Sequence, residues 1–268
     1  MPRLFISPLR RVSAEGTRND QDLVAVEAPL TIEVQAHGAA PASLGIFLRT
    51  PGDDESLALG LLYSEGVIRS IADVAGTTLE VAADEASATI RVALASHVAF
   101  DAAALGRSGI ANTSCGLCGR LTDQLGHKLP APKNETGTHF PEMSPGLIFS
   151  LPRKLRDAQQ LFEETGGLHA AGFFDHGGVA ADIAEDVGRH NAVDKVVGRA
   201  LARGQLPASG RILVVSGRIA FEIVQKAAMA GVRTIVAIGA PTSLAVQAAR
   251  EAGVQLIGFA RDDRFNIY

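Results

Sequence analysis

Three short apolar runs near the C-terminal end constrain the fold of this 268-residue chain more than any other feature. They cover residues 211–216, 234–238 and 254–260, and a turn and a helical pattern follow each of the first two. Short apolar runs that alternate with helices are typical of buried strands in a parallel sheet. The pattern therefore predicts an α/β architecture in which these three strands lie parallel to one another.

The residues before these runs extend the same unit. Two helical patterns enclose a pair of strand patterns, and Gly177-Gly178 separates the two strands as a two-residue hairpin turn would. Residues 151–268 are thus predicted to fold in the order helix, two strands, helix, strand, helix, strand. The additional predicted elements are helices at 153–164 and 190–202 and strands at 168–176 and 179–185.

The rest of the chain divides into three segments. Residues 1–21 are polar and charged, and we expect them to be loosely ordered. Residues 22–110 read as a small α+β domain. Residues 111–150 contain prolines that exclude regular elements, so we expect a long surface loop. The predicted elements of the small domain are strands at 30–34, 44–48, 77–82 and 88–94 and a helix at 56–65.

Composition excludes several classes of function. Apolar residues make up 47% of the chain, which is enough for a sizeable core. The 25 basic and 29 acidic residues give a net charge of −4, and no basic run is present, so we expect no nucleic-acid partner. No apolar stretch approaches the length of a membrane span, and the first residues lack a secretory apolar core. Two clustered cysteines without an export signal predict a cytoplasmic protein.

The only two cysteines of the chain, Cys115 and Cys118, form a Cys-x-x-Cys pair among small residues. This spacing leaves three functional alternatives: a redox pair, half of a metal site or a sulfur carrier. The alternative without a function is that the two cysteines form an exposed disulfide or remain two inert thiols. A zinc site needs two further ligands, and the available His169 and His190 lie 21 residues apart. Nucleobase deaminases also need a glutamate two residues after the histidine, and Ala171 stands there.

Three predicted loops meet at one edge of the parallel sheet. They are 216–218, 239–243 and 261–264, which follow the three strands. In open parallel sheets, ligands bind outside the carboxyl ends of the strands. Hydroxyls, arginines and helix N-terminal amides suit an anion such as phosphate, although each turn taken singly also reads as a well-capped βα turn. In the polar segment 185–195, Asp186 or Asn191 is an equally good candidate for a helix cap or for a site.

The motifs of this chain resemble those of the FdhD family, in the same order from about residue 28 onward. The resemblance implies a cytidine-deaminase-like, three-layer α/β/α domain after the small α+β domain, without zinc chemistry. Ala184 departs from the family, where many members carry arginine. The matching motifs are 49–55 (RTPGDDE), 62–66 (LYSEG), 113–119 (TSCGLCG), 166–172 (GGLHAAG), 185–195 (EDVGRHNAVDK), 216–218 (SGR) and 264–268 (RFNIY).

The resemblance also implies a function. Proteins of this family are sulfur carriers that take persulfide sulfur from a cysteine desulfurase and pass it to the molybdenum cofactor of formate dehydrogenase. Cys115 would carry the persulfide, and Cys118 would assist the transfer or resolve it. The client would be Mo-bis(molybdopterin guanine dinucleotide), no structural metal is expected, and the protein would be a homodimer. The residues implied to contact the cofactor are Phe259, Ala260, Arg261, Asp262, Asp263 and Arg264.

Two alternatives from other classes remain at this point. A zinc-dependent, deaminase-like hydrolase would use Cys115, Cys118 and a histidine as ligands. A non-enzymatic chaperone would bind the molybdenum cofactor and use the cysteines only to hold its metal. Zinc content separates the first alternative, and the carriage of sulfane sulfur separates the second.

Overall fold

A six-stranded sheet forms the centre of the C-terminal part of the molecule. The computed structural model describes residues 1–100, 140 and 142–268. The strands lie in the order β12-β11-β10-β9-β7-β8. Their bounds are His169–Phe174 (β7), Ala180–Asp186 (β8), Ile212–Val215 (β9), Thr234–Ala237 (β10), Gln255–Gly258 (β11) and Asn266–Ile267 (β12).

The pairing of these strands confirms the predicted parallel core. Strands β9, β10 and β11 pair in parallel, and β7 and β8 form the predicted antiparallel hairpin. Gly178 in its turn has a φ of 76°, a conformation that glycine adopts without strain. Strand β7 joins the parallel strands by antiparallel pairing with β9. The short strand β12, which pairs antiparallel with β11, was not predicted.

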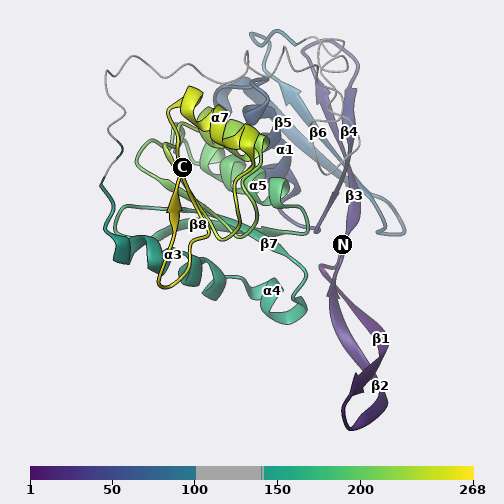
Figure 1. Cartoon of the computed structure of the whole chain (residues 1–268). Coiled ribbons are helices and arrows are strands. Elements are labelled where there is room, and N and C mark those ends of the chain that lie inside the picture. Colours follow the sequence, from purple (N-terminus) through teal and green to yellow (C-terminus); the bar gives the residue numbers. More distant parts are fainter. Residues whose placement is uncertain (101–139, 141) are drawn as a thin grey trace.

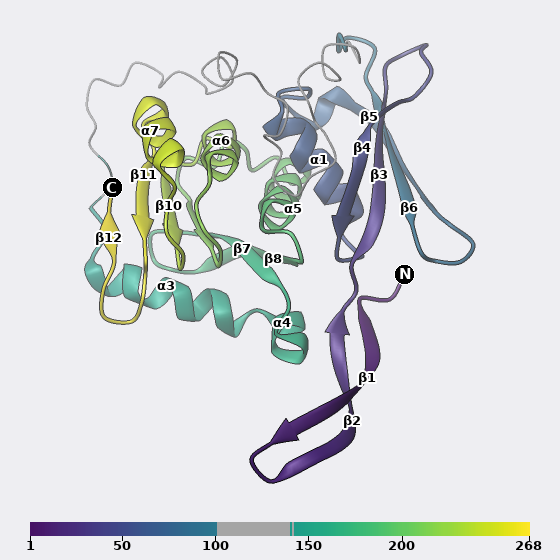
Figure 2. The same cartoon turned by 45° about the vertical axis from the view of Figure 1, so that its right-hand side comes forward.

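Helices cover both faces of this sheet. Helices α5 (Arg189–Ala202), α6 (Phe221–Met229) and α7 (Ser243–Ala252) lie on one face, and α3 (Pro145–Asp157) lies on the other (Figures 1 and 2). The three-layer α/β/α arrangement is therefore confirmed. Helix α3 buries an apolar stripe against the sheet, and the residues in this cluster include Ile148, Leu151, Leu155, Phe174, Ile212, Val214, Val236 and Ile257.

The prediction of one helix over 153–164 was wrong, as was a loop through residue 150. Helix α3 begins at Pro145, where Ser144 caps it by accepting the N–H of Leu147 at 3.2 Å. A second helix, α4 (Gln160–Thr165), then begins separately. The carboxylate of Glu185 accepts the N–H groups of Leu161 and Phe162, in the first turn of α4, at 3.0 and 2.8 Å. A partner this distant in sequence leaves no local signal of the break.

A second sheet of four strands, in the order β4-β3-β6-β5, belongs to the N-terminal part. Every second residue of β3 and β6 is buried, as their alternating sequences predicted. The loop before helix α1 (Asp54–Ser64) connects this sheet to the contact between α1 and α5 that is described below. The strand bounds are Ala28–Gln35 (β3), Ala42–Arg49 (β4), Val74–Val81 (β5) and Ala88–Leu94 (β6), and a short 3₁₀ turn, η1, covers Ile71–Asp73.

The first residues form a long hairpin, which corrects the expectation that 1–21 is loosely ordered. Strands β1 (Leu4–Ser13) and β2 (Gly16–Ala25) pair only with each other, along ten residue pairs. The hairpin projects from the body beside α4 (Figures 1 and 2). Polar composition did not reveal it, because both faces of a projecting ribbon meet water and need no apolar alternation.

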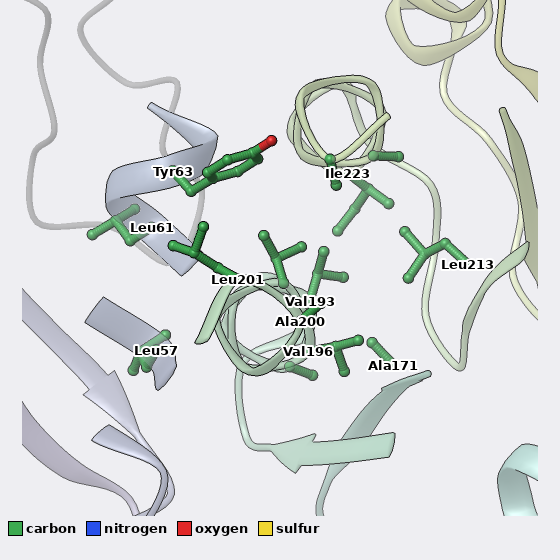
Figure 3. Packing of buried hydrophobic residues seen from close by; sticks show 14 of the residues in the cluster. Leu57, Leu61, Tyr63, Ala171, Val193, Val196, Ala200, Leu201, Leu213 and Ile223 are labelled. Carbon is green, nitrogen blue, oxygen red and sulfur yellow. The ribbon is translucent and has the colours of Figure 1, made fainter. Parts of the chain in front are cut away.

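The main core lies where α1, α5 and α6 meet the large sheet. Val193 and Val196 of α5, Leu213 of β9 and Ile223 of α6 lie together in it (Figure 3). Helices α1 and α5 cross with backbones in contact, and glycines make the approach possible. A Cβ on Gly60 would overlap the carbonyl oxygen of Asp194, and one on Gly198 would overlap that of Ser56. None of the described helices is long and apolar enough to cross a membrane.

Candidate functional site at the carboxyl edge of the sheet

The three predicted loops do meet at the carboxyl edge of the parallel strands. The N–H of Gly239 donates to the carbonyl of Gly217 at 3.2 Å, which joins the β9 and β10 loops. The N–H of Phe259 donates to the carbonyl of Gly239 at 3.1 Å, which adds the loop after β11. A Cβ on Gly239 would lie 2.9 Å from the Cα of Arg218, so glycine is needed for this close contact. Backbone hydrogen bonds thus hold the loops in one row.

His169 and Ser216 extend this row to β7. The hydroxyl of Ser216 accepts the N–H of Ala170 at 2.9 Å and lies 3.4 Å from the Nδ1 atom of His169. Burial, helped by the charge of Arg189 and opposed by Asp186, lowers the pKa of the imidazole below its usual 6.5. At neutral pH, His169 is therefore uncharged, and it lies at the carboxyl edge of the parallel strands.

The segment 259–264 is a tight turn that follows β11. The N–H of Arg261 donates to the carbonyl of Arg264 at 2.9 Å. Phe259 has a φ of 53° and a side chain that is 43% exposed, so an aromatic ring stands at the edge on a backbone conformation that glycine usually adopts. Ala260 is buried and contributes packing. Asp262 and Asp263 are exposed.

Arg261 is partly engaged within this turn. Its Nη1 atom donates to the carbonyls of Ile238 at 2.7 Å and Ala260 at 2.8 Å. The guanidinium therefore braces the ends of β10 and β11. Arg264 is exposed, and no side-chain bond of its own is seen among the described residues.

The segment 185–195 does not cap its helix in the way the sequence suggested. Gly188 is the N-cap of α5, and Asp186 is instead wholly buried. One oxygen of Asp186 accepts from the N–H of Gly188 at 2.8 Å and from the amide of Asn191 at 2.9 Å. The other lies 2.7 Å from the ammonium of Lys195, which is also wholly buried. This ion pair holds the start of α5 in place.

A second buried pair lies deeper between α5 and α6. The ammonium of Lys226 donates to both oxygens of Asp194 at 2.7 and 2.8 Å, and the hydroxyl of Ser64 reaches the same carboxylate at 3.2 Å. Burial raises the pKa of Asp194 to about 6, although Lys226 opposes the shift. Local pattern gave no sign of either pair, because charged residues on a helix usually indicate a face exposed to solvent.

Cys115 and Cys118 lie outside the described residues. Among the residues that are described, no group of three or more histidine, cysteine, aspartate or glutamate side chains could hold a metal ion. The Nε2 atom of His190 lies 3.8 Å from an oxygen of Glu222 at the start of α6. The expectation that the protein holds no structural metal therefore stays a prediction.

The described part is thus a mixed α/β protein whose polar loops gather at one sheet edge beside a neutral histidine. The chain belongs to the FdhD/NarQ family, whose model matches residues 25–268. The chain is 44% identical to the sulfur carrier protein FdhD of Saccharolobus solfataricus over 260 residues, which cover 97% of this chain and 94% of that protein. It is 43% identical to the protein of that name from Streptomyces avermitilis, covering 96% and 90% of the two chains.

A solved structure shows the same fold. It comes from Desulfotalea psychrophila and is described as a formate dehydrogenase accessory protein. The two structures superpose with a TM-score of 0.72, and the match covers 99% of this chain and 96% of that chain at 22% sequence identity. The FdhD resemblance and the mixed α/β fold expected from the sequence are therefore confirmed.

Proposed function

We propose that this protein is a sulfur carrier that serves formate dehydrogenase. It accepts persulfide sulfur from a cysteine desulfurase and passes it to the molybdenum cofactor before the cofactor enters the dehydrogenase. The observation that supports the proposal is the family match over residues 25–268, a range that contains the only two cysteines of the chain. The proposed place of action is the cytoplasm, where thiols stay reduced, and the proposed working form is a homodimer.

In the first step, the thiolate of Cys115 attacks the outer sulfur of the persulfide on the desulfurase. A new S–S bond forms on Cys115, and the S–S bond of the donor breaks. The electron pair of the broken bond returns to the donor cysteine, which leaves as a thiolate. The thiolate is the reactive form in such exchanges, so the step accelerates as the thiol of Cys115 loses its proton.

In the second step, Cys118 releases the sulfur to the client. Its thiolate attacks the inner sulfur of the Cys115 persulfide, a Cys115–Cys118 disulfide forms, and the outer sulfur leaves as hydrosulfide at the cofactor. A dithiol reductant then restores both thiols by taking over the disulfide. The short sequence separation favours a disulfide between Cys115 and Cys118, because only two residues lie between them.

The client cofactor is proposed to bind at the carboxyl edge, with its guanine at 259–264. The exposed ring of Phe259 offers a stacking surface, and Asp262 or Asp263 can accept from the N1–H and amino groups of guanine. Arg264 is available for a phosphate. The convergence of the three loops on one edge supports this placement.

Mass spectrometry tests the carrier role directly. The protein is incubated with a desulfurase and cysteine, and the expected result is one added sulfur atom on Cys115. Cys115→Ser should fold, accept no sulfur and give no active formate dehydrogenase in a strain that lacks its own carrier. Cys118→Ser should still accept sulfur on Cys115 but should lose dehydrogenase maturation. Full dehydrogenase activity with Cys115→Ser would remove this residue from the role.

The same samples decide between the proposal and its rivals. About one zinc ion per chain, lost in Cys118→Ser, would favour the hydrolase. Protein that binds cofactor but never carries labelled sulfane sulfur would favour the chaperone. We expect neither result.

A further inference from the structure

An open notch lies where α3 ends and α4 begins (Figure 2). Its volume is about 650 Å³, within the range of roughly 300–1,000 Å³ that is typical of ligand sites. The function proposed above makes no use of this place, which we call the α3–α4 notch. Its lining residues are Arg156, Asp157, Gln159, Gln160, Glu163 and Glu164.

The side chains of the α3–α4 notch carry a net negative charge. One arginine lies there among three carboxylates, and this arginine is already engaged, because Arg156 pairs with Glu163 at 2.9 Å. Asp157 and Glu164 are exposed. In the part of the chain that the structure describes, neither of them forms an ion pair. Two carboxylates of the notch are therefore left for a cation from outside.

The ends of the two helices strengthen this preference. Helix α3 has 13 residues, and its last carbonyls place negative partial charge at the notch. The positive end of α4 is offset by the carboxylate of Glu185, which accepts the N–H groups of Leu161 and Phe162. Lys154, in the last turn of α3, is held by the carbonyl of Gly178 at 2.6 Å. The notch therefore attracts a cation.

Two donors in the same notch lack an acceptor. Gln159 is only 3% exposed, and its Nε2 atom has no hydrogen-bond partner among the described residues. The Nη1 atom of Arg156 is likewise shielded from solvent without a partner. The Arg156 guanidinium lies over the ring of Phe162, 4.1 Å from its centroid, which holds it in this position. Because a shielded donor without an acceptor is costly, an acceptor from outside the chain is expected here.

A bound segment of peptide meets both requirements. A free anion would satisfy the two donors, but the three carboxylates repel it. A free cation would suit the carboxylates and leave the donors unpaired. A peptide carries neutral carbonyl acceptors on its backbone and, where it contains arginine or lysine, a cation on its side chain.

We propose that the α3–α4 notch binds an extended, basic segment of a partner protein. A backbone carbonyl of the segment accepts from Nε2 of Gln159 and Nη1 of Arg156, and its arginine or lysine pairs with Asp157 and Glu164. Glu164 precedes His169 by five residues, so the partner is held next to the carboxyl edge of the sheet. The inference does not depend on the sulfur chemistry proposed above.

A titration followed by amide NMR tests the charge requirement. The probes are capped pentapeptides of glycine with two arginines, two glutamines or two glutamates. The arginine peptide should shift the amide signals of residues 156–164 and bind about 10-fold more tightly than the glutamine peptide, and the glutamate peptide should not bind. The double variant Asp157→Asn, Glu164→Gln should bind the arginine peptide about 5- to 10-fold more weakly. The matched control is Glu80→Gln with Glu251→Gln, which neutralises two exposed carboxylates on β5 and α7 and should change binding by less than about twofold.

Gln159→Leu tests the requirement for an acceptor. The variant removes one donor and keeps every charge, so it should weaken the arginine and glutamine peptides by the same factor, about 3- to 10-fold. It should also raise the midpoint of urea unfolding, because a buried donor without a partner is gone. Even if this variant did not fold, Asp157→Asn with Glu164→Gln would still decide the proposal, since both residues are exposed.

Other results would overturn the site. Equal affinities for the arginine and glutamine peptides, unchanged binding by the Asp157→Asn, Glu164→Gln protein, or shifted signals outside α3 and α4 would each do so. A Gln159→Leu protein that is less stable than the wild type and binds the peptides equally well would show that the donor has a partner within the chain. If analytical ultracentrifugation shows that Asp157→Asn with Glu164→Gln converts an oligomer to a monomer, the occupant is a second copy and the assignment to a partner protein fails. Sulfur acceptance by Cys115 is a separate measurement, so the carrier function and this site can fail independently.

Discussion

Replacing Gly198 with alanine should separate the two helices on which the core depends. The added methyl group would overlap the carbonyl oxygen of Ser56 and lie 2.9 Å from the backbone nitrogen of Gly60. Both obstacles are backbone atoms, so no side chain can turn away, and α1 must move off α5. Overpacking of this kind costs roughly 1–3 kcal/mol or more. The better helix propensity of alanine returns up to about 1 kcal/mol.

We therefore expect Gly198→Ala to lower the free energy of unfolding by about 2 kcal/mol, measured by urea denaturation with linear extrapolation. The matched control is Gly146→Ala in the first turn of α3, where a Cβ meets no atom within 4 Å. That variant should be as stable as the wild type or gain up to about 1 kcal/mol. A Gly198→Ala protein as stable as Gly146→Ala would refute the close backbone contact between α1 and α5.

Three further predictions concern the charged groups. Lys195→Met should lose about 3–5 kcal/mol of stability, because it leaves Asp186 charged and enclosed, whereas Arg203→Met, whose side chain is 53% exposed, should change by less than about 1 kcal/mol in the same urea assay. The stability of the wild type relative to Asp194→Asn should fall by about 2 kcal/mol as the pH rises from 4 to 7, because folding raises the pKa of this carboxyl from 3.8 to about 6 and ionisation then opposes the folded state. A constant difference between the two proteins in urea unfolding across this range would contradict it. The NMR titration midpoint of His169 should lie below 6.5 and should rise in Arg189→Gln, because the variant removes a positive charge beside the imidazole; an unchanged midpoint would show that this charge does not act on it.

Elements with a local signature were predictable. The strand predicted at 88–94 coincides with β6, and the helix predicted at 190–202 differs from α5 by one residue. Apolar periodicity decides such elements, since each must bury one face. The carboxyl edge was predictable for a topological reason: parallel strands bring the loops that follow them to the same side.

The parts that were missed depend on partners distant in the sequence. Lys195 and Asp186 are close along the chain, but their burial requires Thr50, which lies 136 residues before Asp186. The engagement of Arg261 by its own strand ends likewise follows from packing, because the sequence shows only an exposed charged turn. The motif at 49–55, which contains Thr50, was the one sequence signal that the residues around Thr50 are important.

The contacts of Thr50 limit how this protein can be truncated and how its two parts can be exchanged by recombination. Thr50 is buried, and its N–H donates to the carboxylate of Asp186 at 3.2 Å. Its hydroxyl accepts the N–H of Val187 at 3.1 Å, and its carbonyl accepts from the ammonium of Lys195 at 3.0 Å. A fragment that began after the small sheet would keep the ion pair and lose three of the bonds around it, with a charged pair opened to water. The two sheets are therefore not interchangeable modules: a recombination event that exchanged one without the other would have to supply a new Thr50.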